Sequence, residues 1–143
     1  MNPNQVDLIR DSFVQMLVDS ERTACLFYDR LFELAPETRP LFRNDMAEQG
    51  RRLVDALARI VTGLSRLEAM LPGLRKLAQG HVGYGVEERH YAMAGDALLH
   101  VVTVYGGPNT DPATVEAWTV AYDLVAGAMI EASSDLWAAR DAA

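Results

Sequence analysis

Apolar residues recur every three or four positions along nearly the whole sequence, and no run alternates between apolar and polar residues for long enough to predict a strand. Turn-forming residues divide this pattern into about six longer helices and one short helix. At 143 residues the chain has the length of one domain with a single sizeable core. We therefore expect one all-α domain that spans residues 1–143.

Prolines and capping residues predict the helix boundaries in the first half of the chain. Ser20 with Glu21 resembles an N-cap and predicts the start of the second helix, which Pro36 ends. A short turn-like helix is expected over residues 37–42. Asp45, followed three residues later by a glutamate, resembles a capping box at the start of a helix that continues to about residue 64.

The second half of the chain is divided in the same way. Pro72 predicts the start of the next helix, and the glycines at positions 80, 83 and 85 predict its end. A further helix is expected from Glu87 to about Tyr105, closed by the Gly-Gly-Pro sequence at 106–108. Asp111 and the proline after it provide a cap and a first-turn residue for the last helix.

The composition excludes several classes of function. A net charge of −7 leaves no basic stripe for phosphates, so we expect no binding to nucleic acid or to an anionic membrane. The single cysteine, Cys25, excludes an intrachain disulfide and any multi-cysteine metal site. Charged residues, glycines and prolines interrupt every apolar stretch before the length of about 20 residues that a membrane span requires. We expect a cytoplasmic protein.

Three polar side chains fall on the inward faces of predicted helices: Tyr28, Gln49 and His81. Each alone has an ordinary structural explanation, since buried phenols, amides and imidazoles often only satisfy the core. Together they indicate a pocket. A single histidine is too few ligands for a tight non-haem metal site, but one imidazole suffices as the axial ligand of haem iron. His90 and His100 are too far apart for one metal site within a helix.

Four segments of the chain resemble the globin family. Residues 31–42 resemble the junction of its second and third helices, with the family's proline at Pro36 and its haem-stacking ring at Phe42. Residues 77–81 resemble the helix of the proximal histidine, and residues 84–91 resemble the segment that follows it in bacterial single-domain globins and flavohaemoglobins. Residues 117–122 resemble the start of the last helix. The resemblance runs from about Gln5 to Trp137.

The resemblance implies a globin fold around haem b, which is iron protoporphyrin IX. It makes His81 the proximal iron ligand and assigns Tyr28, Gln49 and Leu53 to the distal side, where O2, CO or NO binds. The cofactor-binding residues that it implies are Phe42, Gln49, Arg52, Leu53, Leu77, His81, Val86 and Tyr91. Arg52, one turn after Gln49, could meet a haem propionate or could equally be a solvated arginine.

The sequence departs from the flavohaemoglobin pattern on the proximal side. Aligned on Ala117 and Trp118, Ser133 stands where those proteins have a glutamate, and Glu131 lies on a different helical face. A carboxylate hydrogen-bonded to the proximal imidazole raises its electron donation and favours O–O cleavage. Without that carboxylate, peroxidase-like chemistry is not expected.

Three functional hypotheses are compatible with these residues. The first is a reversible O2-binding globin for storage, delivery or scavenging. The alternative is a nitric oxide dioxygenase, which would need an external reductase because the sequence contains no glycine-rich nucleotide-binding motif. The third is a haem-free helical interaction module, which the presence of both His81 and Phe42 disfavours.

Overall fold

A computed structural model describes residues 1–43 and 45–142 and confirms the all-α prediction, with no strand among these residues. The α-helices are α1 (Pro3–Val18), α2 (Ser20–Leu34), α3 (Met46–Gly63), α4 (Leu67–Gly83), α5 (Glu88–Gly106) and α6 (Pro112–Ala142). The expected short helix is the 3-10 helix η1 (Pro36–Leu41). Two further 3-10 segments, η2 (Leu64–Arg66) and η3 (Gly107–Asn109), were not expected.

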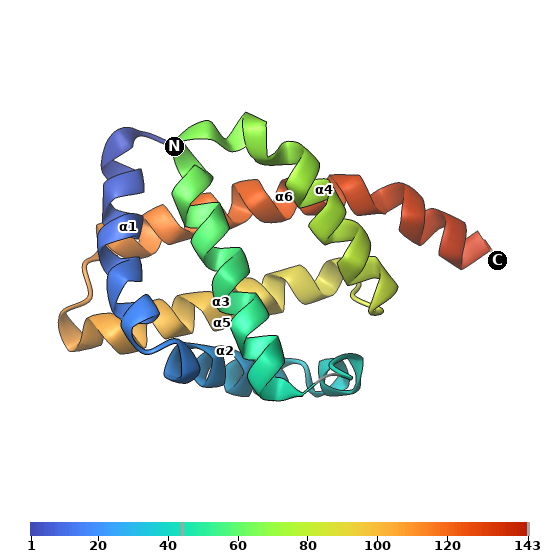
Figure 1. Cartoon of the computed structure of the whole chain (residues 1–143), viewed down its shortest axis with the longest axis horizontal. Coiled ribbons are helices and arrows are strands. Elements are labelled where there is room, and N and C mark those ends of the chain that lie inside the picture. The colour runs from blue at the N-terminus through green and yellow to red at the C-terminus, as the bar shows by residue number, and fades with distance from the viewer. Residues whose placement is uncertain (44, 143) are drawn as a thin grey trace.

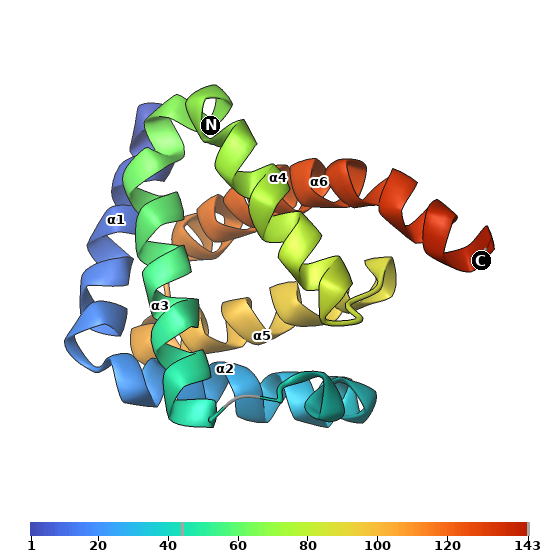
Figure 2. The same cartoon turned by 45° about the vertical axis from the view of Figure 1, so that its right-hand side comes forward.

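The helices pack in crossed pairs. The principal contacts join α4 to α6, α2 to α5, α1 to α6 and α2 to α3. In Figure 1, α3 runs in front of α5, and the end of α6 projects at the right. Figure 2 shows α3 and α4 diverging from a shared corner. Among the described residues, no helix is long and apolar enough to cross a membrane.

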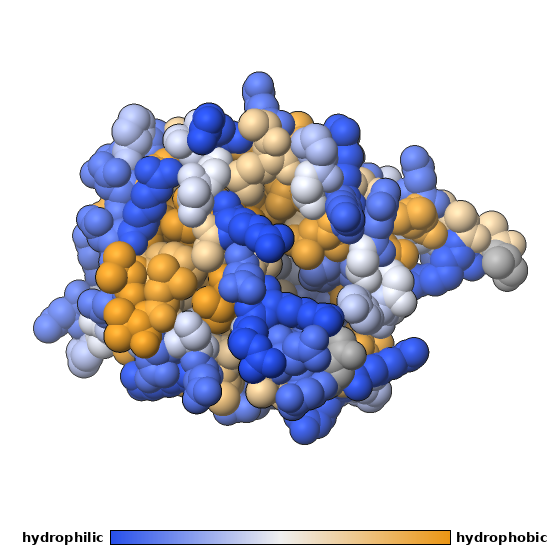
Figure 3. Space-filling model, in the orientation of Figure 1, coloured by the Kyte–Doolittle hydropathy of each residue, from blue (hydrophilic) through white to orange (hydrophobic). Residues whose placement is uncertain are grey.

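Most of the face in Figure 3 is hydrophilic, with an apolar patch near the end of α1. This helix exposes three large apolar side chains in its last two turns, Val14, Leu17 and Val18. Such patches often mark contact surfaces, but nothing in the structure identifies a partner for this one.

Several predicted boundaries are confirmed. Asp45 caps α3 by accepting a hydrogen bond from the backbone N–H of Ala47, and Asp111 accepts one from the N–H of Ala113 at the start of α6. The predicted capping box at Asp45 is incomplete, because the Glu48 carboxylate pairs with Arg52 at 2.9 Å instead. Pro36 begins η1, and Ala35 caps the end of α2 directly before it.

Two boundary predictions are wrong. The cap of α2 is Asp19, whose carboxylate accepts from the N–H of Arg22, so Ser20 is already the first helical residue. Pro72 lies inside α4 and not near its start, because the helix begins at Leu67. A proline inside a helix removes one backbone hydrogen bond and crowds the preceding turn, and the contacts of Leu67 and Met70 with the core stabilise that turn.

The apolar core is divided into two clusters. The first contains buried side chains of α1, α2, α5 and the beginning of α6, and the second joins α4 to the middle of α6. Among the described residues, only Ile60 and Tyr122 contact both clusters. Several apolar side chains at the edges of the clusters stay half-buried, including Phe42, Leu57 and Leu77.

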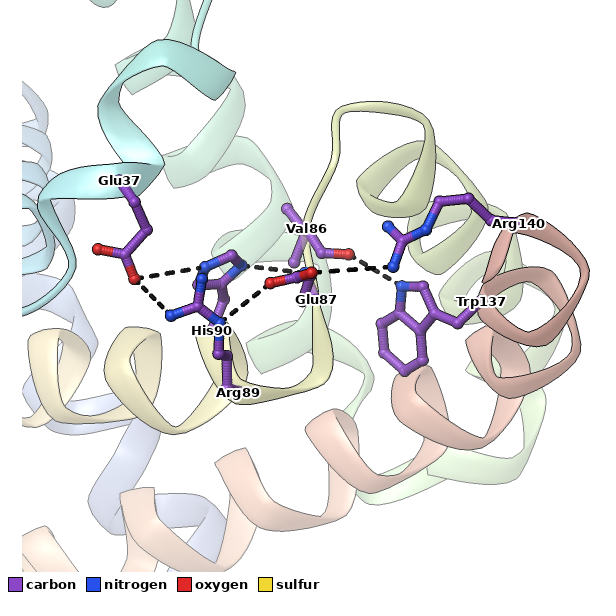
Figure 4. Close-up of polar contacts among 7 residues, drawn as sticks. All are labelled: Glu37, Val86, Glu87, Arg89, His90, Trp137 and Arg140. Carbon is purple, nitrogen blue, oxygen red and sulfur yellow. Dashed lines mark hydrogen bonds and ion pairs between the residues drawn. The ribbon is translucent and has the colours of Figure 1, made fainter. Parts of the chain in front are cut away.

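A buried histidine links η1 to the start of α5. His90 is 6% exposed, and its Nδ1 accepts a hydrogen bond from the backbone N–H of Glu87. Because Nδ1 accepts, the ring proton of the neutral imidazole is on Nε2, which lies 3.7 Å from a carboxylate oxygen of Glu37. Arg89 also binds Glu37, at 2.7 Å (Figure 4). Burial and the neighbouring Arg89 lower the pKa of His90, and Glu87 and Glu37 partly oppose them.

The closest approach of α2 to α3 depends on a glycine. A Cβ atom added at Gly50 would lie 2.8 Å from the Cβ of Ala24, closer than two such atoms can pack. The contact lies one turn before Tyr28 in α2 and directly after Gln49 in α3. The absence of a side chain at Gly50 therefore sets the spacing between the helices that carry these two residues.

We expect Gly50→Ala to destabilise the protein by about 1–3 kcal/mol, because the two backbones must separate to admit a methyl group. Gly73→Ala is the matched control, since a Cβ there meets no atom within 4 Å. That substitution should be neutral or stabilising by up to about 1 kcal/mol in an exposed helix position. Urea unfolding of both variants measures the difference, and equal effects would contradict the close-contact argument.

We expect His90 to make the protein less stable in mild acid. Because its folded pKa lies below the unfolded value of 6.5, its contribution is complete above that value and is lost as the pH falls toward the folded pKa. His90→Gln keeps an acceptor for the N–H of Glu87 but does not titrate. Between about pH 7.5 and pH 5.5, unfolding midpoints should therefore fall less for this variant than for the parent. If the unfolding midpoints of the variant and the parent fall equally over this pH range, the titration of His90 does not contribute to the loss of stability.

Candidate functional site

The predicted distal residues Tyr28 and Gln49 come together where α2 faces the first turns of α3. Tyr28 is 6% exposed, and its burial raises the pKa of the phenol to about 12. The side-chain amide of Gln49 lies close enough to act on this pKa in the opposite direction. Tyr28 is thus a neutral O–H donor buried in the first cluster, beside a half-buried amide.

Aromatic rings hold Tyr28 in place. Phe27 and Phe42 meet its ring edge-on at 5.1 Å between centroids, and Phe32 stacks on it at 5.8 Å. Phe42 follows the last residue of η1 and is half-buried. Leu53 packs against the same cluster from α3. The four residues predicted for this side, Tyr28, Phe42, Gln49 and Leu53, therefore occupy one region.

Arg52 is placed differently from these residues. Its side chain is half-exposed and pairs with Glu48 one turn earlier in α3. An exposed pair of this kind contributes little to stability. The structure thus gives Arg52 a partner within its own helix, and a role toward a propionate stays a prediction.

The predicted proximal histidine is oriented by its own helix. His81 lies in the last turn of α4, and its Nδ1 is 2.8 Å from the backbone carbonyl oxygen of Leu77. A carbonyl can only accept, so Nδ1 carries the proton and the lone pair is on Nε2. Burial lowers the pKa of His81, and the hydrogen bond to Leu77 partly opposes this shift. The result is a neutral imidazole with a metal-binding nitrogen directed away from its helix.

Tyr91 lies beside His81 in the second cluster. Their ring planes are inclined by 24°, with centroids 6.3 Å apart. The buried hydroxyl of Tyr91 has no hydrogen-bond partner among the described residues. The side chain of Ser133 lies close enough to lower the pKa of Tyr91, against the effect of burial. Ser133 is fully buried and donates to the carbonyl of Met129, whereas Glu131 is exposed. Ser133 therefore holds the position beside Tyr91 at which the resemblance to flavohaemoglobins implies a glutamate.

These residues fit a haem group. The imidazole of His81 is in the neutral tautomer that a metal requires, with Nε2 in no hydrogen bond among the described residues. The two core clusters meet only at Ile60 and Tyr122 within the described chain, which leaves half-buried apolar side chains on both. Leu77 and Val86 belong to the second cluster and Phe42 to the first. A flat apolar cofactor would cover the surface that these side chains leave incompletely buried.

Sequence reasoning missed Trp137. Its ring meets Tyr91 edge-on at 6.4 Å, and its Nε1–H donates to the carbonyl of Val86 at 2.9 Å. A buried or half-buried tryptophan usually finds a partner for its N–H. Because the chain has only two tryptophans, the sequence could have indicated Trp137 as a residue with a specific contact.

Sequence comparisons find relatives among bacterial globin-like proteins and flavohemoproteins. The family model described as "Globin" matches residues 26–129. An uncharacterised globin-like protein of Aquifex aeolicus is 29% identical over 110 residues, covering 77% of this chain and 78% of that protein. A flavohemoprotein of Bacillus thuringiensis is 29% identical over 115 residues. That match covers 78% of this chain, and the chain spans only 28% of the flavohemoprotein's length.

Solved structures share the fold. A bacterial globin from Campylobacter jejuni is 30% identical with a TM-score of 0.80, covering 95% of this chain and 99% of that one. Ferric myoglobin of Aplysia limacina is 20% identical with a TM-score of 0.79, covering 92% of this chain and 98% of that one, and shows likeness of fold alone. Together with the family model, which matches most of the sequence, these similarities show that the chain belongs to the globin family.

Proposed function

We propose that this protein is a cytoplasmic, single-domain globin that binds haem b and binds O2 reversibly, for storage, delivery or scavenging. Proteins of the globin family bind haem, and the family binds diatomic gases. The observation that supports reversible O2 binding most directly is the pairing of a buried neutral phenol, that of Tyr28 in the first cluster, with the half-buried amide of Gln49.

The proposed cofactor contacts follow from the two clusters. His81 supplies the iron ligand through Nε2, and Phe42 of the first cluster packs on the haem from the distal side. Leu77, Val86 and Tyr91 line the proximal side, and Arg52 would have to exchange Glu48 for a propionate. When bound, haem supplies an iron atom with one coordination position open to a diatomic ligand.

The distal residues act as hydrogen-bond donors. Bound O2 carries partial negative charge, so an O–H from Tyr28 and an N–H from Gln49 would stabilise it. The raised pKa of Tyr28 keeps its proton in place at any physiological pH. Gln49 is a poor iron ligand, which favours an open sixth position.

The proximal residues favour binding over bond cleavage. The Nδ1–H of His81 donates to a neutral carbonyl, that of Leu77, and not to a carboxylate. The neighbour of Tyr91 is Ser133 and not an acid. Both features keep the electron donation of the imidazole modest, which disfavours peroxidase-like chemistry.

The second candidate function is nitric oxide dioxygenation with a separate reductase. It is supported by the 29% identity to flavohemoproteins, whose name pairs a flavin with a haem protein. The same distal donors would serve both functions, so turnover separates them. Sustained consumption of NO in the presence of a reductase supports the enzyme, and a stoichiometric reaction supports the O2 carrier.

We expect His81→Ala to lose stable iron ligation, because the ring of His90 is engaged with Glu87 and Glu37 and His100 lies ten residues further along α5. Gel filtration followed by an absorbance spectrum measures the loss. His100→Ala is the control and should keep the parent spectrum. A native-like spectrum for the His81 variant would show that the proximal assignment is wrong.

We expect Tyr28→Phe and Gln49→Leu each to accelerate O2 dissociation. A hydrogen bond to a charged partner contributes about 1.5–3 kcal/mol, and at about 1.4 kcal/mol per factor of ten its loss corresponds to roughly a tenfold to hundredfold faster off-rate. The two effects need not add, because both donors serve one small ligand. Stopped-flow and flash-photolysis rates on both single variants and the double variant provide the measurement.

Carbon monoxide is the control for this prediction, because bound CO carries much less negative charge than bound O2. Its off-rate should therefore change far less in both variants. If Tyr28→Phe leaves the O2 off-rate within about twofold of the parent, or changes the CO off-rate equally, Tyr28 is a packing residue and the distal network does not exist.

A further inference from the structure

Three aromatic rings lead from the proximal histidine toward the surface. The centroids of His81 and Tyr91 are 6.3 Å apart, and those of Tyr91 and Trp137 are 6.4 Å apart. Tyr91 is buried in the second cluster, whereas Trp137 is half-buried at its edge. O2 binding requires the distal side and does not use Trp137.

Trp137 lines an open hollow of about 600 Å³ between the start of α5 and the end of α6. Its ring is fixed there by the hydrogen bond from Nε1 to the carbonyl of Val86 (Figure 4). The residues that line the hollow with it are Glu87, Glu88, Arg89, Arg140 and Asp141. The end of the aromatic chain is therefore reachable by a molecule that docks at this hollow.

The charges of the hollow favour a basic partner. Arg89 binds Glu37 and Glu87, and Arg140 binds Asp141 at 3.2 Å and lies 3.9 Å from Glu87. Both guanidinium groups are thus engaged within the protein, and the same ion pairs engage the carboxylates of Glu87 and Asp141. Glu88 is exposed and forms no ion pair among the described residues, and the whole chain carries a net charge of −7. Opposite charge on a partner would steer its approach to this face.

We propose that this hollow is the docking surface for the protein that reduces the haem iron, and that Trp137 and Tyr91 connect it electronically to His81. The partner is a reductase that presents a reduced flavin within a basic docking face. The inference rests on the proposed function, because it requires haem ligated by His81.

The transfer involves one electron and no atoms. An anionic reduced flavin gives up one electron and becomes the neutral semiquinone, and ferric iron becomes ferrous. No proton moves, and neither aromatic side chain is itself oxidised or reduced. The rings act because tunnelling through closely spaced π systems is faster than tunnelling through an aliphatic or solvent-filled gap.

The electronic path can be tested by fixing the donor in the hollow. Cys25→Ser leaves no other thiol, and Asp141→Cys then carries a ruthenium tris-bipyridine label at a residue that lines the hollow. A flash in the presence of a sacrificial amine donor generates the reduced label, which passes one electron to ferric haem, and the Soret band reports this intramolecular reduction. Trp137→Leu should slow this reduction severalfold, whereas Trp137→Phe, which keeps a ring, should slow it less. Leu136→Ala, at the exposed neighbouring residue, should leave the rate unchanged.

The docking surface can be tested with a second probe, a ferredoxin–NADP reductase that has a lysine-rich docking face. Glu88→Lys should lower its bimolecular rate of ferric haem reduction by about tenfold at low ionic strength, and the difference should shrink as salt is added. Glu116→Lys, at an exposed residue near the other end of α6, is the matched control and should change the rate far less.

The outcomes separate this proposal from the one on which it rests. A chain that binds no haem overturns both. A haem protein whose intramolecular reduction is the same in Trp137→Leu, Trp137→Phe and the parent overturns the electronic path. Equal bimolecular rates for Glu88→Lys and Glu116→Lys overturn the docking surface.

Discussion

The division of the apolar core into two clusters is the constraint on which the site depends. Within the described residues only Ile60 and Tyr122 pack against both clusters, and α4 packs mainly on α6 whereas α3 packs mainly on α2. Apolar side chains that a single core would bury, such as Phe42 and Leu77, stay half-buried. Exposed apolar surface of this kind costs free energy unless something covers it. A haem between the clusters would stabilise the fold while it creates the function.

Two local contacts convert this general arrangement into a specific site. On one side, the missing side chain of Gly50 lets α3 approach Ala24 and brings Gln49 beside Tyr28. On the other side, the carbonyl of Leu77 fixes the proton of His81 on Nδ1 and leaves Nε2 with its lone pair. The first contact sets the distance between α2 and α3, and the second sets which ring nitrogen of His81 carries the proton. Neither involves a charged group, so both persist across the physiological pH range.

The sequence predicted the helices better than their exact boundaries and the contacts between them. Periodicity predicted six helices and put Tyr28, Gln49 and His81 on inward faces, because a helix repeats its environment every three or four residues. It could not predict that α4 begins before Pro72, since tertiary packing of Leu67 decides that boundary. The contacts of Glu37 with Arg89 and His90 were also missed, because pairs separated by more than 50 residues leave no periodic signal.

The proposed roles of the two sides reinforce each other. Under the proposed function, donors at Tyr28 and Gln49 would stabilise negative charge on bound O2, and they would equally stabilise the charge that builds up during O–O cleavage. Only the proximal side can separate these outcomes. A neutral carbonyl on His81 and a serine beside Tyr91 withhold the electron donation that cleavage requires. Electrons that arrive through Trp137 would reach the iron from this same side, so a docked reductase and a distal ligand would not compete for space.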